Sequence, residues 1–231
     1  MFRPSNTIVG LEIGTSKVCA IVGEMSAEGA LNIIGIGQAR SRGVRKGEIT
    51  DPQTVEEDIR HAIAEAEQTA DVEIRSVYLG VTGSHIRGFV NRGFHPVVAE
   101  DREVSSEDVE SVVKNAKAIN LPQENTVIHS IRQHFVLDGQ EGIERPVTMV
   151  GARLEVDLHV IHGNFNRLQN PIRVVKGLQL EVESIVFNGL GSALSLLTSE
   201  QKELGALVID FGAGIERPVT MVGARLEVDL H

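Results

Sequence analysis

Two short segments near opposite ends of the chain share one pattern, an apolar run that ends in an acidic residue and then glycine. The first is VGLEIGTSK at 9–17, and the second is VIDFGAG at 208–214. Glycine permits a tight turn after a strand, and the backbone amides of such a turn can face an anion. Two such turns at one cleft would hold a polyphosphate from both sides. The pattern therefore predicts a fold that brings these distant segments together.

The first segment offers several groups suited to a phosphate. Gly14, Thr15 and Ser16 supply amides and hydroxyls, and Lys17 adds a cation. Glu12 could hold a metal ion through water, as Mg²⁺ sites often do. The segment is not a Walker A loop, which requires Gly-Lys where Thr15 and Ser16 precede the lysine. Taken alone, the segment is better explained as a plain hairpin turn.

The second segment repeats this arrangement with Asp210, Gly212 and Gly214 after a buried strand-like run. A simple strand-to-turn junction is the alternative for this segment alone. The two segments together are more informative than either one.

The chain around these segments alternates strand-like and helix-like patterns. Three apolar runs in the first 40 residues indicate an antiparallel opening. Asp51-Pro52 marks a helix start, and apolar residues then recur at helical spacing from Val55 to Ala66. Strands are expected at 77–81, 180–187 and 206–210, with a helix at 189–197. This alternation predicts an α/β layer architecture.

The middle of the chain has a different character. Residues 105–108 read as a cap for a helix with one apolar face, and residues 126–137 and 147–161 are strand-like. We therefore expect an α+β block at about 85–161, placed between two parts of one larger lobe.

Composition limits the function. The formal net charge is -10, so the basic footprint of a nucleic-acid-binding protein is missing and no nucleic-acid partner is expected. Cys19 is the only cysteine, which fits a reducing compartment. The first six residues lack the apolar core of a signal peptide, and no run approaches the ~20 apolar residues of a membrane span. A cytoplasmic location is expected.

One repeat is anomalous. Residues 142–159 and 214–231 are identical, GIERPVTMVGARLEVDLH. Natural repeats diverge and usually need about three copies for stability. An error in the determined sequence, a recent gene rearrangement or a functional duplication could explain the copy, and we favour the first. Residues 215–231 are therefore set aside from the fold.

Four segments together resemble one family. The paired turns are similar to the phosphate motifs of the actin, Hsp70 and sugar-kinase superfamily. VGLEIGTSKVCAIVGE at 9–24, SRGVRKGEITD at 41–51, SVYLGVTGSHI at 76–86 and ALVIDFGAG at 206–214 resemble the bacterial FtsA family in particular. The resemblance covers residues 1–214.

The resemblance implies an actin-like, ribonuclease-H-like α/β ATPase lobe with an inserted α+β subdomain. The first lobe would comprise residues 1–84 and 162–204, and the insertion residues 85–161. Residues 205–214 would begin a second lobe that is otherwise largely missing, and 215–231 would be an aberrant copy of 143–159.

The resemblance also implies ATP and Mg²⁺ as ligands. By position, Gly14 to Lys17 would contact phosphate, Glu12 would lie near the metal, and Asp210, Gly212 and Gly214 would begin the second phosphate loop. Members of the family form filaments with themselves and link the FtsZ ring and later division proteins to the membrane. They reach the cytoplasmic side of the membrane through a C-terminal helix that this chain lacks.

The chain departs from the family after Gly214, where Ile215 replaces the expected threonine. The resemblance thus describes a C-terminally truncated member, which we expect to bind ATP poorly and to be at most a weak ATPase with the nucleotide as an assembly switch. Two alternatives remain open. One is a phosphotransferase of the same superfamily, which would need a general base, and the other is a fragment without function.

Overall fold

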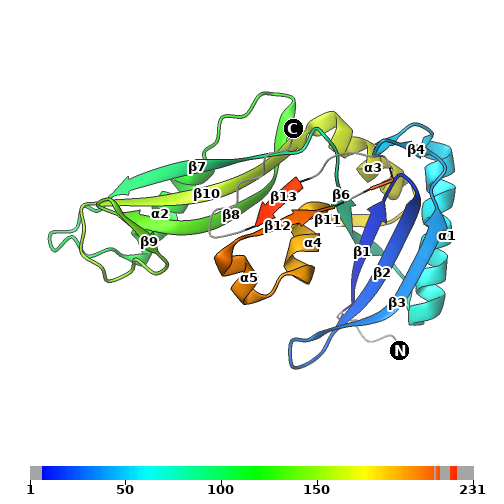
Figure 1. The fold of residues 1–231 in the computed structure, drawn as a ribbon, viewed down its shortest axis with the longest axis horizontal. Coiled ribbons are helices and arrows are strands. Elements are labelled where there is room, and N and C mark those ends of the chain that lie inside the picture. The colour runs from blue at the N-terminus through cyan, green and yellow to red at the C-terminus, as the bar shows by residue number, and fades with distance from the viewer. Residues whose placement is uncertain (1–6, 211, 214–218, 223–231) are drawn as a thin grey trace.

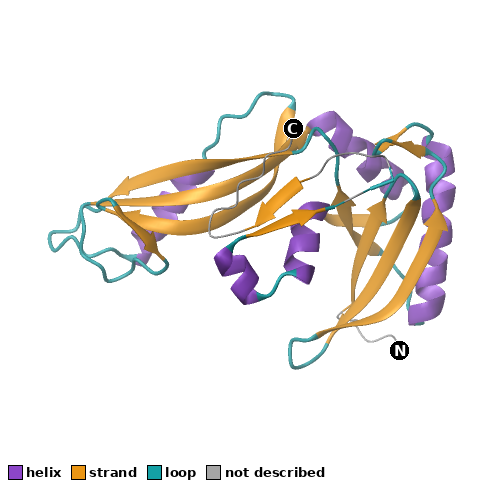
Figure 2. Ribbon diagram, in the orientation of Figure 1, coloured by secondary structure: helices purple, strands orange, loops and turns teal. Residues whose placement is uncertain are grey.

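The computed structural model describes residues 7–210, 212–213 and 219–222. Its two main parts are a lobe built on a five-stranded sheet and an inserted four-stranded sheet that extends away from the lobe (Figure 1). Figure 2 shows helices against both sheets. The lobe and the inserted block are therefore separate parts of one chain.

The lobe sheet has the strand order β11-β6-β1-β2-β3. Its antiparallel half consists of β1 (Thr7–Ile13), β2 (Lys17–Met25) and β3 (Leu31–Arg40). On the other side of β1, β6 (Ser76–Val81) and β11 (Glu181–Phe187) run parallel to it. The carboxyl ends of β1, β6 and β11 thus meet at one edge, the usual place for a ligand in such sheets.

One face of this sheet is covered by helices. Helix α1 (Pro52–Ala70) packs on β2 and β3, and α3 (Phe165–Gly177) contacts α1 and β11. Helix α1 begins after its N-cap residue Asp51, whose side chain accepts a hydrogen bond from the Thr54 N–H. The apolar side chains predicted from helical spacing are buried in the lobe core: Val55, Ile59, Ala62, Ile63 and Ala66.

Helix α1 also closes the outer edge of β3. The Ile36 N–H donates to Thr69 Oγ1 at 3.1 Å, and the Gln38 N–H donates to Glu65 Oε2 at 2.7 Å. The helix can approach this closely because Gly37 carries no side chain, and a Cβ there would overlap the Ala62 carbonyl oxygen. The side-chain bonds thus satisfy donors that an edge strand would otherwise leave free.

The inserted sheet has the order β7-β10-β8-β9. Its strands are β7 (Arg87–Pro96), β8 (Asn125–Leu137), β9 (Gln140–Ile143) and β10 (Arg153–Asn164). Helix α2 (Ser106–Lys117) packs on β7 and β10 and begins with the expected capping box between Ser105 and Asp108. The insertion has its own apolar core, which includes Val112, Ala116, Phe135, Leu154, Val156, Leu158 and Val160.

The strand expected at 147–161 starts later than predicted. Residues 147–148 form a turn, with Thr148 at φ 72°, and β10 begins at Arg153. A β-branched residue at positive φ is unusual, and the alternating pattern of the sequence does not reveal it.

Part of the second copy of the repeat is also ordered. Residues 215–231 were not expected to take part in the fold. Val219–Val222 nevertheless forms β13, which pairs antiparallel with β12 (Ala206–Ile209). The same residues, VTMV, thus form a turn with a bridge at 147–150 and a strand at 219–222. Their surroundings decide the backbone conformation, as expected for strand formers.

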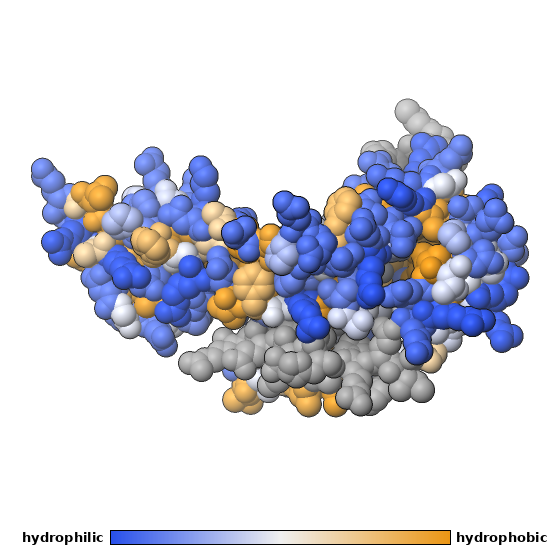
Figure 3. All heavy atoms as spheres, turned by 90° about the horizontal axis from the view of Figure 1, so that it is seen from above, coloured by the Kyte–Doolittle hydropathy of each residue, from blue (hydrophilic) through white to orange (hydrophobic). Residues whose placement is uncertain are grey.

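Four short elements complete the fold. They are β4 (Val44–Arg45), β5 (Glu48–Ile49), α4 (Asn188–Leu196) and α5 (Ser199–Leu204). Figure 3 shows one face that is mostly hydrophilic, with apolar side chains in separate patches. None of the helices in the described part of the chain has the length and apolar character needed to cross a membrane.

Candidate functional site

A cavity of about 640 Å³ lies where the two sequence motifs meet. Its size is within the usual range of small-molecule sites, about 300–1,000 Å³. The β1–β2 turn forms one wall, the start of α4 another, and the segment after β12 a third. The lining includes Gly10, Glu12, Gly14, Thr15, Ser16, Lys17, Tyr78, Gly80, Asn188, Gly191, Ser192, Asp210, Gly212 and Ala213.

Six of the seven residues predicted to face phosphate line this cavity. Gly14 to Lys17 come from the β1–β2 turn, and Asp210 and Gly212 follow β12. The seventh, Gly214, lies outside the described residues. The predicted meeting of the two segments is therefore present, while phosphate binding by these residues stays a prediction.

The β1–β2 turn is held by its own backbone and by a neighbouring loop. The Gly14 N–H donates to the Lys17 carbonyl at 2.9 Å, and a Cβ on Gly14 would lie 2.9 Å from that oxygen. The Gly47 N–H donates to Thr15 Oγ1 at 2.9 Å, and the Ser41 N–H donates to the Ser16 carbonyl at 3.0 Å. The loop at 41–51 therefore fixes the turn in place.

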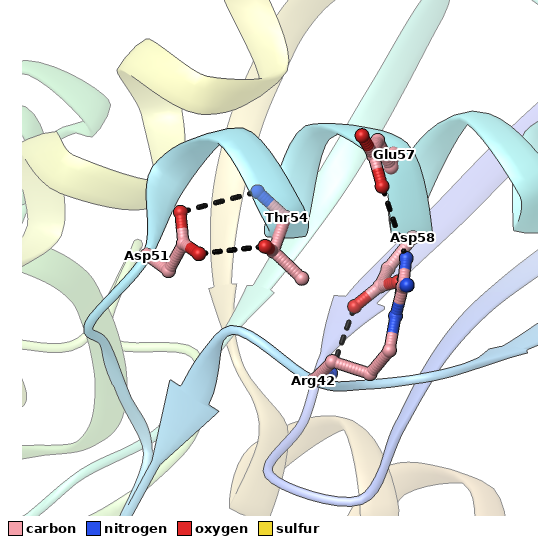
Figure 4. A network of polar contacts seen from close by, with 5 residues as sticks. All are labelled: Arg42, Asp51, Thr54, Glu57 and Asp58. Atoms are coloured by element: carbon pink, nitrogen blue, oxygen red, sulfur yellow. Dashed lines mark hydrogen bonds and ion pairs between the residues drawn. The ribbon is translucent and has the colours of Figure 1, made fainter.

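That loop is in turn attached to α1 through a buried carboxylate (Figure 4). Asp58 is 2% exposed, and its two oxygens accept the Arg42 backbone N–H and the Arg42 Nε–H, each at 2.8 Å. Arg42 also contacts the exposed Glu57 at 3.2 Å. The hydrogen bond to Asp58 contributes most to raising the pKa of the Arg42 guanidinium. The SRGVRKG segment thus acts as a structural support for the cavity.

Glu12 lies on the cavity side of β1, opposite the buried Leu11. Burial in the cavity wall raises the pKa of the Glu12 carboxyl, and the negative charge of Asp210 raises it further. Lys17 and a hydrogen bond from Asn188 lower that pKa. Two carboxylates at one cavity repel each other, and a divalent cation between them would remove this repulsion. The donors present therefore fit Mg²⁺, although Glu12 as its water-mediated ligand remains a prediction.

Asn188 is a cavity residue that the sequence did not reveal. It is the first residue of α4, and its Nδ2 donates to Glu12 Oε1 at 3.1 Å. The available signal was its place directly after the parallel strand β11, because ligands bind beyond the carboxyl ends of such strands.

Several known proteins resemble this chain in sequence. A family model described as the SHS2 domain inserted in FtsA matches residues 83–162. The cell division protein FtsA of Pseudomonas aeruginosa is 42% identical over 207 residues, 90% of this chain and 49% of that protein. The chain is related to FtsA. FtsA from Escherichia coli K12 is 42% identical over 95% of this chain, and FtsA from Borreliella burgdorferi is 38% identical over 90%.

The FtsA-like chain spans about half the length of these curated relatives, 49% to 52% of each. The match to the inserted domain covers the region where the sequence placed an α+β block. The limits drawn at 84/85 and 161/162 stay predictions.

Solved structures identify the fold of the FtsA-like chain as actin-like. The PilM-PilN type IV pilus biogenesis complex aligns over 96% of this chain and 60% of that chain, with a TM-score of 0.63 and 14% identity. Ethanolamine utilization protein EutJ from Carboxydothermus hydrogenoformans covers 98% of this chain and 51% of that chain, with a TM-score of 0.50 and 14% identity. Such low identity concerns the fold alone, and it agrees with the α/β lobe predicted from the paired motifs.

Proposed function

We propose that this chain binds ATP with Mg²⁺ in the cavity between the β1–β2 turn and the segment after β12, and that it binds weakly because its sequence departs from the family pattern after Gly214. The observation that carries the proposal is the presence of Gly14 to Lys17 and of Asp210 and Gly212 on one cavity. In this arrangement the turn amides and Lys17 contact the phosphates from one side. The glycine-rich segment after Asp210 contacts them from the other, and Glu12 holds the metal through water.

We further propose that the nucleotide acts as an assembly switch in an FtsA-like cell-division protein. Relatives named cell division protein FtsA support this function. Self-association into filaments, contacts with FtsZ and later division proteins, and attachment to the cytoplasmic side of the membrane through a C-terminal helix are proposed for the full-length protein. In this proposal ATP binds the assembling state more tightly than the other state, and this difference in affinity shifts the equilibrium toward assembly.

The binding proposal is tested with a fluorescent ATP analogue and with ATP in competition, in the presence of Mg²⁺ or EDTA. The wild-type chain should show saturable binding that weakens without Mg²⁺. Lys17→Gln should weaken binding by about tenfold or more, because a charge-assisted bond to phosphate is lost. Lys114→Gln on the exposed side of α2 is the matched control and should leave binding unchanged. Equal affinities for the wild type and Lys17→Gln would refute the assigned phosphate site.

The assembly proposal requires a separate measurement. Sedimentation and light scattering of the full-length protein with ATP, with ADP and without nucleotide should show assembly that depends on ATP. Assembly that ignores the nucleotide, in a chain that binds ATP, would contradict the switch but leave the binding site intact.

A further inference from the structure

A hydrogen bond connects the inserted sheet to the wall of the cavity. The Phe187 N–H donates to Nε2 of His129 at 3.0 Å. His129 lies on β8 of the insertion, where it pairs with Ile161 of β10. Phe187 ends β11 of the lobe. The bond therefore joins the lobe to the base of the inserted sheet, where Ile128 and Ile131 pack against the lobe core.

The acceptor is well suited to this contact. Burial is the only cause that acts on the pKa of His129, and it lowers that pKa. The imidazole is thus neutral at ordinary pH. Because Nε2 accepts the amide hydrogen, the ring proton lies on Nδ1. Protonation of Nε2 would remove the acceptor.

Phe187 occupies a position that controls the start of α4. It is the N-cap residue of α4, and its own side chain offers no capping hydrogen bond. The Phe187 ring is buried at 1% exposure in the lobe core. A displacement of this backbone would therefore move the first residue of α4 with it.

That first residue is Asn188, which contacts the cavity directly. Its Nδ2 donates to Glu12 Oε1 at 3.1 Å. Its Oδ1 lies close to the backbone of Gly80, where an added Cβ would overlap it. Asn188 thus has little freedom, and its place follows from the place of Phe187.

We propose that His129 is a positioning residue through which the inserted subdomain holds the start of α4 and the Asn188–Glu12 pair of the cavity. The consequence for nucleotide binding rests on the proposed function, whereas the positioning of Asn188 does not. Coupling of this kind is reciprocal, so a ligand in the cavity also strengthens the attachment of the insertion.

The first test needs no ligand and uses the full chain. An N–H···N scalar coupling between Phe187 N and His129 Nε2 should be visible by ¹⁵N NMR in the wild type. The side-chain amide of Asn188 donates to Glu12, so its ¹H and ¹⁵N signals should shift in His129→Phe, because that bond is weakened. His129→Gln, which keeps an acceptor oxygen, should restore the wild-type shifts. Glu12→Ala is the positive control and should shift the same Asn188 signals, because it removes the acceptor.

The second test measures ATP affinity in the same variants. His129→Phe should bind about three- to tenfold more weakly than the wild type, the usual effect of one lost hydrogen bond, and His129→Gln should bind nearly as well. Val112→Ala, which weakens the core of the insertion far from the cavity, should change stability but not affinity.

The outcomes separate the two proposals. A wild-type chain that does not bind ATP overturns the proposed function, and the Asn188 amide signals still decide the role of His129. A missing scalar coupling in the wild type overturns the positioning role, even if His129→Phe fails to fold. Asn188 side-chain shifts that are the same in the wild type and in His129→Phe also overturn it.

Discussion

Asp58 shows how one side chain supports a site that it does not touch. Its buried carboxylate holds Arg42. On either side of Arg42, Ser41 donates to Ser16 and Gly47 donates to Thr15 of the β1–β2 turn. Asp58 is buried and Glu57 is exposed, so the two acidic partners of Arg42 should contribute unequally to stability.

Asp58→Ala should lower the free energy of unfolding by about 2–3 kcal/mol, because two hydrogen bonds to a charged group are lost. It should also weaken ATP binding through the loosened turn. The control is Glu57→Ala, whose 66% exposed side chain should cost less than about 0.5 kcal/mol. Urea unfolding of both variants measures the difference, and equal losses would contradict the role of Asp58.

The buried side chain of His159 should make the folded chain less stable in acid. The side chain is 1% exposed, neither ring nitrogen has a partner within the described residues, and burial lowers its pKa from 6.5 to about 4. As the pH falls below about 6.5, the unfolded chain takes up a proton before the folded chain does. Stability is therefore full above about pH 6.5 and decreases toward pH 4, by at most about 3 kcal/mol from this group.

His159→Phe should remove this part of the pH dependence and should not lower stability at pH 7. His61→Gln, at an exposed position on α1, should keep the wild-type profile. Chemical unfolding between pH 4 and pH 8 checks both variants. A wild-type slope in His159→Phe would show that other groups cause the acid sensitivity.

At the scale of elements, the contact between α1 and β3 is the tightest in the lobe that we describe. Gly37 should not tolerate a side chain, because a Cβ would overlap the Ala62 carbonyl oxygen of a helix that cannot move without opening its core. Gly37→Ala should cost about 3 kcal/mol or more, as overpacking at such sites does.

Gly191→Ala is the matched control for this substitution. Gly191 lies within α4, and a Cβ there meets no atom within 4 Å. Alanine should therefore be neutral or stabilise the chain by up to about 1 kcal/mol through helix propensity. Thermal unfolding of the two glycine variants gives the comparison, and similar losses in both would contradict the packing argument.

The elements that the sequence predicted best are those whose signals are local. Asp51 and Pro52 mark the start of α1, and the Ser105–Asp108 box marks the start of α2, because caps depend on neighbours in sequence. The predicted start of β10 was wrong by several residues. Thr148 lies in a turn at positive φ, a conformation that a β-branched residue rarely adopts. Asn188 had one sequence signal, its place directly after β11, whereas the role of His129 depends on a contact between distant segments and left no local pattern.

At the scale of the whole molecule, the insertion should fold by itself. It has a core separate from that of the lobe, and about 80 residues suffice for an independent domain. Expressed alone, residues 83–162 should give a dispersed NMR spectrum and cooperative unfolding. The fragment should be less stable than in the full chain, because Ile128, Ile131 and Ile161 lose their packing against the lobe. A spectrum typical of a random coil would contradict this prediction.

At the scale of the whole molecule, the sequence predicted one arrangement, the meeting of the β1–β2 turn and the segment after β12. The hypothesis that two acid-glycine turns share one ligand predicted that the two segments meet, and residues of both line one cavity. The sequence could not reveal how the insertion meets the lobe, because that contact depends on buried side chains such as Phe187 and Ile161. Gly214 lies outside the described residues, so its predicted role stays open.

The two settings of VTMV have a practical consequence for mass spectrometry. Any peptide cut from within 142–159 has the same mass as its twin from 214–231. Deuterium uptake by such a peptide should therefore give two overlapping isotope envelopes, one from the turn at 147–148 and one from the ladder of β13 with β12. A single envelope from this pair would mean that both copies open at one rate, whatever their neighbours.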